Sequence, residues 1–350
     1  MSAELLAVDT AFGLIERAIA CGPIPGAAAA IGDRGDERLA CFGRTEPDGP
    51  AVTAETWYDL ASLTKVLCTV PLLVQAVASG RIDPQAPLRD MLPETAWLQD
   101  RPNLGDATVI QLATHTSGLA AWQPLYTLGL NRATLVARLL HTPLERAPGG
   151  IVYSDLGYML LGYLLERVLE APLDVLAHGL FARVGLDGAL AFQVPADAPI
   201  APTERCPWRG RVLRGEVHDE NAAAYGGVAG HAGLFGTLRG VCGYARALLE
   251  CRLQSAAVLA YLSREHARGA PPDLERRGFG WVLMHPGWSG GDLVSQHSIG
   301  HTGFTGTGLW IDLERGRYTV LLTNRVHPTR HVESNIVGLR RAFNNAAHAA

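Results

Sequence analysis

The single lysine of this 350-residue chain stands three residues after a serine. Among the 30 lysine and arginine side chains, Lys65 alone is a lysine. An arginine guanidinium stays protonated in a protein, whereas a desolvated lysine amine can lose its proton and act as a base. Residues i and i+3 share one face of a helix, so the amine of Lys65 can reach the hydroxyl of Ser62. The pair indicates a nucleophilic serine with a lysine base, and the alternative is a helix-capping serine followed by a structural lysine.

The residues after Ser62 predict the helix that holds this pair. Segment 62–79 is apolar and ends before Gly80, as expected for a buried helix. The positive end of a helix dipole favours an alkoxide and disfavours an ammonium. Lowering a lysine pKa to near neutrality takes roughly three units, or about 4 kcal/mol. We therefore expect burial and neighbouring cations to lower the pKa of Lys65 as well.

Two later motifs follow the serine and lysine in a fixed order. The first is Tyr153-Ser154-Asp155, which precedes a second apolar helix predicted at 156–170. The second is His301-Thr302-Gly303, in a glycine-rich stretch before a strand-like segment. A tyrosine at a helix start usually packs, and a histidine in a glycine-rich loop is usually incidental. The order of the three motifs, rather than any one of them, therefore indicates a catalytic site.

With these motifs the chain resembles the superfamily of serine β-lactamases and penicillin-binding proteins. The resemblance is to the branch that holds class C β-lactamases, DD-peptidases, D-aminopeptidases and related carboxylesterases. The segments that carry it are WYDLASLTK at 57–65, LATHTSGL at 112–119, APGGIVYSDLGYMLLG at 147–162, GEVHDENAAAYGGVAGHAGLF at 215–235 and GHTGFTGTGLWID at 300–312. The chain departs from the common pattern twice, because Asp155 replaces an asparagine and His301 replaces the lysine of a Lys-Thr-Gly motif.

The resemblance implies a role for each residue of the first motifs. Ser62 is expected to be the nucleophile that forms an acyl-enzyme. Lys65 and Tyr153 are expected to share the proton transfers, and which of them takes the proton of Ser62 stays open. The backbone N–H groups of Ser62 and Phe304 are expected to form the oxyanion hole.

The remaining motif residues have less defined roles in the resemblance. His301, with Thr302 and Gly303, is expected on an edge strand, where it touches substrate or the Tyr153 hydroxyl. Asp155 cannot donate the hydrogen bonds of an asparagine amide, so it either repels anionic substrates or holds Lys65.

The segment 217–221 gathers two acids and a histidine, and His231 follows. Adjacent residues of an extended loop point in different directions, and no metal-binding motif is present, so we favour a capped, hydrogen-bonded loop over a metal site. The resemblance implies that His218 and Glu220 lie near the substrate. We expect no metal and no cofactor.

A rival nucleophile is Ser289, because residues 287–291 read GWSGG and match GxSxG. A nucleophile elbow needs a strand before the serine and a helix after it. Here Pro286 precedes the motif and a Gly-Gly pair and a strand-like segment follow it, which is typical of a hairpin turn.

Composition excludes several other functions. With one lysine, the chain has no Walker A motif and no kinase strand lysine. The net charge is −4 and the pI is about 6.3, and the arginines are dispersed, so nucleic acid is not an expected partner. The six cysteines form no disulfide framework, and we find neither a signal peptide nor an 18-residue apolar stretch. We expect a cytoplasmic protein without membrane attachment, acting on a small ester, amide or peptide.

The elements that must position these motifs predict an α/β (α+β) fold. We expect an N-terminal amphipathic helix, a hairpin at 26–44 and a closing helix from Ser334. Other helices are expected at 62–79, 107–115, 132–141, 156–170, 174–183, 239–250 and 254–267, and strands at 278–285, 293–298, 306–313 and 317–326. Strands at both ends around a helical middle indicate a discontinuous sheet domain, 1–61 plus 236–350, and a mainly helical domain, 62–235, with the active site between them. The resemblance implies the same layout: an antiparallel sheet flanked by terminal helices, with an inserted all-α domain.

These observations lead to a hydrolase that cleaves an ester or amide through Ser62. A histidine in His-Thr-Gly resembles DD-peptidases and D-aminopeptidases more than class C β-lactamases, so we favour a carboxylesterase, or an amidase or peptidase acting on a small or cell-wall-derived substrate. A true β-lactamase is less favoured. The alternative from another class is a catalytically weak module that binds muropeptides or β-lactams.

Overall fold

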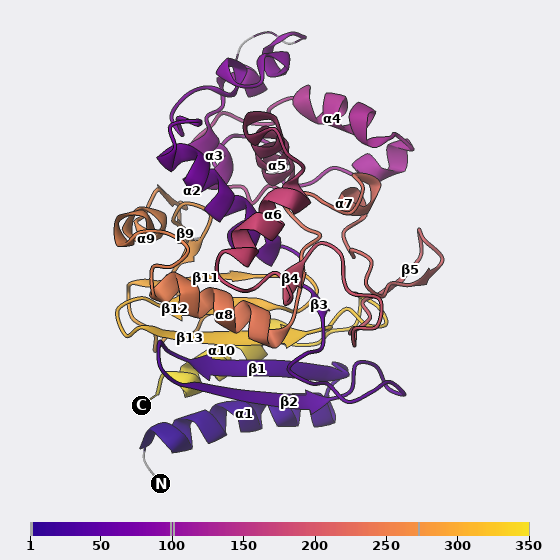
Figure 1. Ribbon diagram of the computed structural model, residues 1–350, viewed down its shortest axis with the longest axis vertical. Coiled ribbons are helices and arrows are strands. Elements are labelled where there is room, and N and C mark those ends of the chain that lie inside the picture. The colour runs from indigo at the N-terminus through magenta and orange to yellow at the C-terminus, as the bar shows by residue number, and fades with distance from the viewer. Residues whose placement is uncertain (1–2, 99, 101, 272–273, 350) are drawn as a thin grey trace.

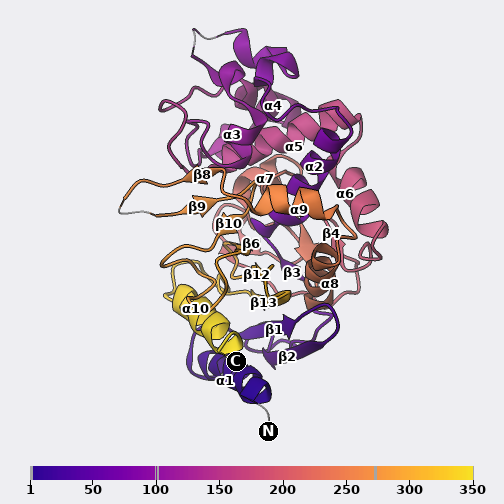
Figure 2. The ribbon, with the colours of Figure 1, turned by 90° about the vertical axis from the view of Figure 1, so that its left-hand side faces the viewer.

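An eight-stranded antiparallel sheet organises the computed structural model, which describes residues 3–98, 100, 102–271 and 274–349. The strand order is β2-β1-β13-β12-β11-β10-β9-β8, so strands from the two ends of the chain, β1 and β13, pair with each other. Helices α1 (Ala3–Cys21) and α10 (Ile336–Ala347) cover one face (Figure 1). Helix α8 (Leu238–Leu249) lies against the other face, on the side of the helical part (Figure 2).

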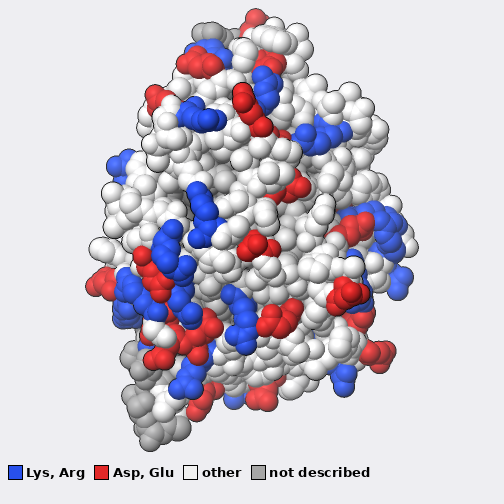
Figure 3. Space-filling view, in the orientation of Figure 1, with Lys and Arg blue, Asp and Glu red and all other residues white. Residues whose placement is uncertain are grey.

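The alternation of side chains along β1 explains the two layers. Successive residues of a strand point to opposite faces of its sheet. Ala28 and Ala30 join the large core that continues into the helical part, whereas Ala27 and Ala29 pack with α1 and α10. The small side chains of β1, buried on both faces, let helices approach the sheet closely. Positive and negative side chains are interspersed over the face shown in Figure 3.

The strands of the large sheet are β1 (Gly26–Gly32), β2 (Glu37–Gly43), β8 (Ala267–Arg268), β9 (Arg276–Arg277), β10 (Val282–Leu283), β11 (Ser298–Thr302), β12 (Gly308–Asp312) and β13 (Arg317–Thr323). A three-stranded sheet is formed by β3 (Tyr58–Asp59), β7 (Phe235–Gly236) and β4 (Leu190–Ala191). A small hairpin joins β5 (Arg205–Cys206) to β6 (Arg211–Val212).

The helical part contains α2 (Val70–Ala78), α3 (Val109–Ala113), α4 (Arg132–Leu140), α5 (Asp155–Leu169), α6 (Leu173–Ala182) and α7 (Glu220–Ala224), and α9 (Ala256–Ser263) lies beside the sheet. Short 3-10 turns lie at Leu88–Asp90, Pro93–Ala96, Leu104–Asp106 and Leu125–Leu128. A π-helical turn, Lys65–Thr69, leads into α2. In the part of the chain that the structure describes, no helix has the length and apolar character needed to cross a membrane.

The predicted fold class is confirmed, but the strand expected at 278–285 is reduced to Val282–Leu283, and two other predicted elements are wrong. The strand expected at 293–298 begins only at Ser298 and continues to Thr302. The helix expected at 254–267 ends at Ser263, because Ala267 pairs with Arg277 as part of an edge strand. In both places pairing with a distant strand overrides the local pattern. The division into domains at 1–61 plus 236–350 and 62–235 stays a prediction.

Candidate active site

Ser62 follows a strained turn that leaves strand β3. Ala61 has a φ of 47°, in the left-handed region that a residue with a Cβ rarely adopts. Its N–H donates to Asp59 Oδ1 at 2.8 Å, and its carbonyl accepts from Thr64 Oγ1 at 2.6 Å. Burial raises the pKa of Asp59, although the hydrogen bonds that its carboxylate accepts from backbone N–H groups act to lower that pKa. The side chains around the turn therefore hold Ser62 in one orientation.

Lys65 is fully buried beneath Ser62 in the π-helical turn. Its amine donates to Ser62 Oγ at 2.8 Å, to Asp155 Oδ1 at 2.7 Å and to the carbonyl of His231 at 3.1 Å. An ammonium has three protons to donate, and each has an acceptor here. The resting arrangement is therefore an ammonium that is fully hydrogen-bonded.

The expectation that the pKa of Lys65 is lowered is wrong for this arrangement. Burial lowers the pKa of Lys65, but the carboxylate of Asp155 and then Tyr153 raise it, and the net direction is upward. A carboxylate 2.7 Å away favours the charged form of an amine more than burial disfavours it. Of the two roles considered for Asp155, the structure shows the contact with Lys65.

Helix α5 places Asp155 where a negative charge is favourable. Ser154 caps the helix, because its Oγ accepts from the N–H of Gly157 and donates to the carbonyl of Ala120 at 2.6 Å. Asp155 is the first helical residue, and its own N–H donates to the carbonyl of Ala121. A carboxylate in the first turn interacts favourably with the helix dipole.

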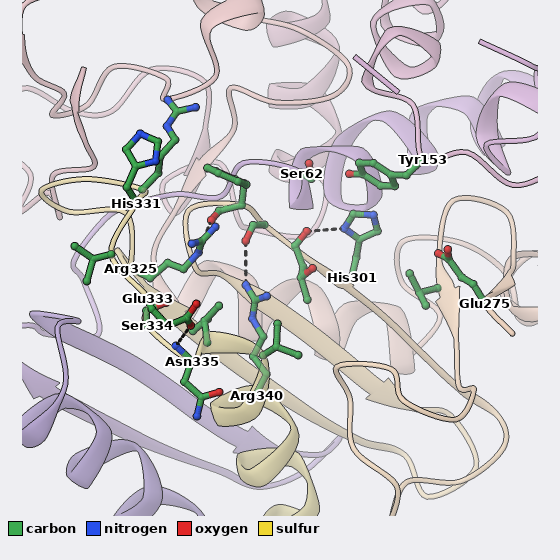
Figure 4. Close-up of a pocket in the computed structure, with 18 of the residues that line it drawn as sticks. Ser62, Tyr153, Glu275, His301, Arg325, His331, Glu333, Ser334, Asn335 and Arg340 are labelled. Atoms are coloured by element: carbon green, nitrogen blue, oxygen red, sulfur yellow. Dashed lines mark hydrogen bonds between the residues drawn. The ribbon is translucent and has the colours of Figure 1, made fainter. Parts of the chain in front are cut away.

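Tyr153 lies among four nitrogen-bearing side chains. Its ring centroid lies 4.9 Å from Lys65 Nζ, 4.5 Å from the ring of His115 and 6.0 Å from the ring of His301. The guanidinium of Arg277 lies 5.4 Å from the same centroid. In Figure 4 the Tyr153 hydroxyl points toward Ser62. The phenol is thus placed between the nucleophile and β11.

His301 is a buried, neutral imidazole at the end of β11. Burial, followed by the charges of Arg277 and Lys65, holds the pKa of His301 well below its usual range. Its Nδ1 lies 2.9 Å from the carbonyl of Thr302, so we assign the proton to Nδ1 (Figure 4). Nε2 has no partner among the described residues, which leaves one acceptor facing the site.

A cavity of about 690 Å³ opens in front of Ser62. Six predicted site residues line it: Ser62, Tyr153, His301, Thr302, Gly303 and Phe304. Its other charged residues are Glu275, Arg277, Arg325, Arg330, Glu333 and Arg340, and these were missed by sequence reasoning. With 29 dispersed arginines in the chain, nothing in the pattern separates the four in the cavity from the others.

Two arginines, Arg325 and Arg340, hold the turn after β11 through hydrogen bonds to its backbone carbonyls. Gly303 is required there, since an added Cβ would lie 2.4 Å from the carbonyl oxygen of Leu60. Arg340 donates to the carbonyls of Gly303 and Thr307 at 2.9 and 2.8 Å, and burial lowers the pKa of Arg340 to about 9. Arg325 donates to the carbonyl of Phe304 at 2.9 Å. The backbone that carries Phe304 is therefore fixed.

His218 and Glu220 do not line this cavity. His218 Nε2 lies 3.0 Å from Glu204 Oε2, and its ring stacks on Phe304 at 5.7 Å. Arg330 bridges Glu204 and Glu220. The two residues therefore support the wall behind Phe304, and their contact with substrate stays a prediction.

The residues considered for a metal site and the rival nucleophile Ser289 are both engaged in structural hydrogen bonds. Asp219 caps α7 by accepting from Ala222, as expected for a hydrogen-bonded loop. Over the described residues, no three His, Cys, Asp or Glu side chains gather in a way that could hold a metal ion. Ser289 lies in the connection between the antiparallel strands β10 and β11, where its Oγ accepts from Trp310 Nε1 at 3.1 Å.

The sequence matches the Beta-lactamase family over residues 13–342, and the chain belongs to that family. A "Putative D-alanyl-D-alanine carboxypeptidase" of Salmonella agona (strain SL483) is 31% identical over 316 residues, which cover 79% of this chain and 71% of the relative. A second protein with that name, from Salmonella enteritidis PT4 (strain P125109), has the same identity and coverage. The resemblance seen in the motifs is confirmed.

Solved structures of low sequence identity share the fold. EstCE1, a hydrolase with promiscuous acyltransferase activity, has a TM-score of 0.80 at 18% identity and covers 99% of both chains. A LovD6 mutant of simvastatin synthase from Aspergillus terreus has a TM-score of 0.76 at 20% identity, covering 99% of this chain and 97% of that one. A class C β-lactamase from Rhodobacter sphaeroides gives 0.74 at 20% identity, with 97% and 99% covered. The fold is therefore that of the β-lactamases and their hydrolase relatives.

Proposed function

We propose that this protein is a serine hydrolase that cleaves a peptide or amide bond next to a carboxylate, through an acyl-enzyme on Ser62. The observation that carries the proposal is the 2.8 Å contact between Ser62 Oγ and the buried amine of Lys65. The substrate class that fits is a small cell-wall-derived peptide ending in a D-amino acid, as the name of the Salmonella relatives suggests. A cytoplasmic location stays a prediction.

In this proposal Ser62 Oγ bonds to the carbonyl carbon and the bond to the leaving nitrogen breaks. The Lys65 amine, in its neutral form, takes the Ser62 proton, and the carboxylate of Asp155, 2.7 Å away, stabilises the ammonium that forms. Tyr153 gives its phenolic proton to the leaving nitrogen and recovers a proton from Lys65. Water then attacks the ester while giving one proton to the neutral amine of Lys65, the bond between the acyl group and Ser62 Oγ breaks, and Lys65 returns that proton to Ser62 as the acid product leaves.

Two backbone N–H groups support an oxyanion hole. Among the described residues, no acceptor is bonded to the N–H of Ser62 or of Phe304. Both positions are rigid, one after the strained turn at Ala61 and the other on the turn held by Arg325 and Arg340. Donors fixed before the reaction stabilise a developing oxyanion without reorganising.

The position of Arg277 favours a substrate that carries a carboxylate. It lines the cavity and is only 4% exposed, and its Nε and Nη1 have no partner among the described residues. Glu275 pairs with Nη2 and leaves those two donors unused. A guanidinium N–H makes a charge-assisted hydrogen bond to a carboxylate, and a buried unsatisfied donor is costly unless a ligand accepts from it.

A carboxylesterase is the second candidate function. Phe304 is 49% exposed at the cavity, which offers an apolar surface to an acyl or alcohol group. His301 is neutral, so β11 itself offers no cation there and β-lactam hydrolysis remains less favoured. A module that binds muropeptides without turnover is the alternative from another class.

Active-site labelling with a fluorophosphonate tests the nucleophile. We expect intact-protein mass spectrometry to show one adduct, and peptide mapping to assign it to Ser62. An adduct on Ser289 would reject the proposal. A Ser62 adduct without turnover of D-alanyl-D-alanine peptides or p-nitrophenyl esters would instead identify the binding module.

Replacing Arg277 by glutamine is expected to separate peptides from neutral esters. We expect kcat/KM for a peptide ending in a free carboxylate to fall about 100-fold, because a buried charge-assisted pair is lost. Turnover of a neutral p-nitrophenyl ester should change less than about threefold, since no carboxylate is involved. Arg276→Gln is the matched control, because Arg276 is bonded to Glu265 and to the carbonyl of Met284 and lies outside the cavity. Equal losses on both substrates would contradict the assignment.

Replacing Asp155 by asparagine is expected to move the acidic limb of the kcat/KM profile to lower pH. Asp155 raises the pKa of Lys65, so its removal leaves burial to lower that pKa. A lower pKa means that the neutral amine, which can accept the Ser62 proton, is present at more acidic pH. The profile is measured up to about pH 12, because the wild-type pKa of Lys65 lies above the ordinary lysine value, with the melting temperature as a check on folding. An unmoved acidic limb would show that Lys65 does not govern it.

A further inference from the structure

The third proton of Lys65 points to a backbone carbonyl in a glycine-rich loop. Lys65 Nζ donates to the carbonyl of His231 at 3.1 Å, beside the contacts with Ser62 and Asp155. Glycine restricts a backbone least, and the loop contains Gly226, Gly227, Gly230 and Gly233. A carbonyl in such a loop needs other contacts to keep its direction.

The ring of His231 supplies one of these contacts. His231 is 1% exposed, and its Nε2 lies 2.9 Å from Asp219 Oδ1. Asp219 is in turn fixed, because the same oxygen accepts from the N–H of Ala222 at 2.7 Å as the cap of α7. His231 thus carries both the carbonyl that accepts a hydrogen bond from Lys65 and the ring that is hydrogen-bonded to Asp219, the cap of α7.

The preceding residue of the loop is held by different means. The carbonyl of Gly230 accepts from Thr69 Oγ1 at 2.6 Å. Gly230 also packs against Gly162 of α5, where a Cβ on Gly230 would lie 2.2 Å from the carbonyl oxygen of Tyr158. These contacts fix the path of the chain up to Gly230, and the Asp219–His231 bond fixes it one residue further, at the carbonyl that faces Lys65.

The carboxylate of Asp219 is held in its charged form. His231 and the N–H of Ala222 outweigh the effect of burial and keep the pKa of Asp219 well below its usual range, and Lys65 contributes in the same direction. A charged acceptor makes a stronger hydrogen bond to the imidazole N–H than a neutral one would. With Nε2 as donor, the buried Nδ1 has no partner among the described residues.

We propose that Asp219 and His231 form a positioning pair that directs the Lys65 amine toward Ser62 and Asp155. Neither side chain touches the reacting atoms. The pair acts through the His231 carbonyl, which accepts one hydrogen bond from the amine. The other two N–H groups of the amine are then directed at the nucleophile and its carboxylate partner. This inference rests on the proposed function, in which Lys65 handles the Ser62 proton.

Two substitutions of His231 separate the hydrogen bond from the packing. His231→Gln places an amide N–H near the position of Nε2 and can still donate to Asp219. His231→Leu fills the space without a donor. We expect the leucine variant to lower kcat about 30-fold with KM changed less than about threefold, because a small misplacement of a catalytic group costs rate rather than affinity. We expect the glutamine variant to recover most of that loss.

The matched control is His348, a buried histidine whose Nδ1 lies 4.0 Å from Asp312 Oδ2 at the end of α10. His348→Leu removes a buried histidine near a carboxylate outside the cavity, where the two side chains are too far apart for a hydrogen bond, and should leave kcat unchanged. Melting temperatures are recorded for all variants. If His231→Leu does not fold, Asp219→Asn replaces it, because an asparagine keeps an oxygen to cap α7 while removing the charge that holds the imidazole.

The outcomes distinguish this inference from the proposed function. A wild type without Ser62-dependent turnover or fluorophosphonate labelling would mean that the proposed function fails. A wild type that turns over, with full kcat in a folded His231→Leu variant, would overturn the positioning pair alone. Equal losses in the glutamine and leucine variants would also overturn it, because the donor would then have no effect.

Discussion

Replacing Ser62 by alanine is expected to abolish turnover of every substrate that the wild type accepts. The hydroxyl oxygen of Ser62 is the atom that bonds to the substrate carbonyl, and it is the hydroxyl held at 2.8 Å from the buried amine of Lys65. We expect kcat/KM to fall by about 10⁴-fold or more, as happens when a catalytic nucleophile is removed. The measurement is steady-state turnover of short-chain esters, D-amino-acid amides and D-alanyl-D-alanine peptides.

Ser289→Ala is the control for this result. Ser289 belongs to the GxSxG sequence, but it accepts a hydrogen bond from Trp310 and does not line the cavity. The Ser289 variant should keep wild-type turnover and wild-type fluorophosphonate labelling. Undiminished activity in a correctly folded Ser62→Ala variant would refute the nucleophile assignment and all that follows from it.

Replacing Lys65 by arginine is expected to be almost as damaging, although the positive charge is kept. A guanidinium cannot give up a proton in a protein, so it cannot accept one from Ser62. It is also larger and planar, in a fully buried place where three acceptors lie within 3.1 Å of one nitrogen. We expect kcat to fall about 1,000-fold or more, since both base catalysis and packing are lost.

Arg252→Lys is the matched exchange for this variant. Arg252 is partly exposed and pairs with Glu250, so the same pair of amino acids is exchanged where no proton transfer takes place. It should leave kcat unchanged. The labelling rate and melting temperature of Lys65→Arg show whether the protein still folds with a reactive serine. Wild-type kcat in a folded Lys65→Arg variant would exclude a transferable proton at this position.

The motifs of the sequence were enough to predict which distant segments meet at the site. Ser62, Tyr153 and His301 lie in three separate motifs, and all three line one cavity. The serine and lysine spacing also predicted the contact between them, because it depends only on local helical geometry. The terminal helices and the hairpin at 26–44 were predictable for the same reason, since their apolar patterns are local.

The balance of charges around Lys65 and the pairing of distant strands could not be predicted from the sequence. The direction of the Lys65 pKa shift depends on a carboxylate 90 residues away, whereas the helix dipole, burial and neighbouring cations together predicted the opposite direction. Arg277 reaches the cavity because β9 pairs with β8 and β10 at the edge of the sheet, in a region that the sequence predicted as helix and loop. Such placements are set by the whole fold, because short edge strands have little pattern of their own.

The burial of the single lysine has a practical consequence for handling the protein. Reagents that acylate or cross-link primary amines reach side chains through solvent, and Lys65 has no exposed surface. Such reagents are therefore expected to leave the Lys65 side chain unmodified while the protein is folded.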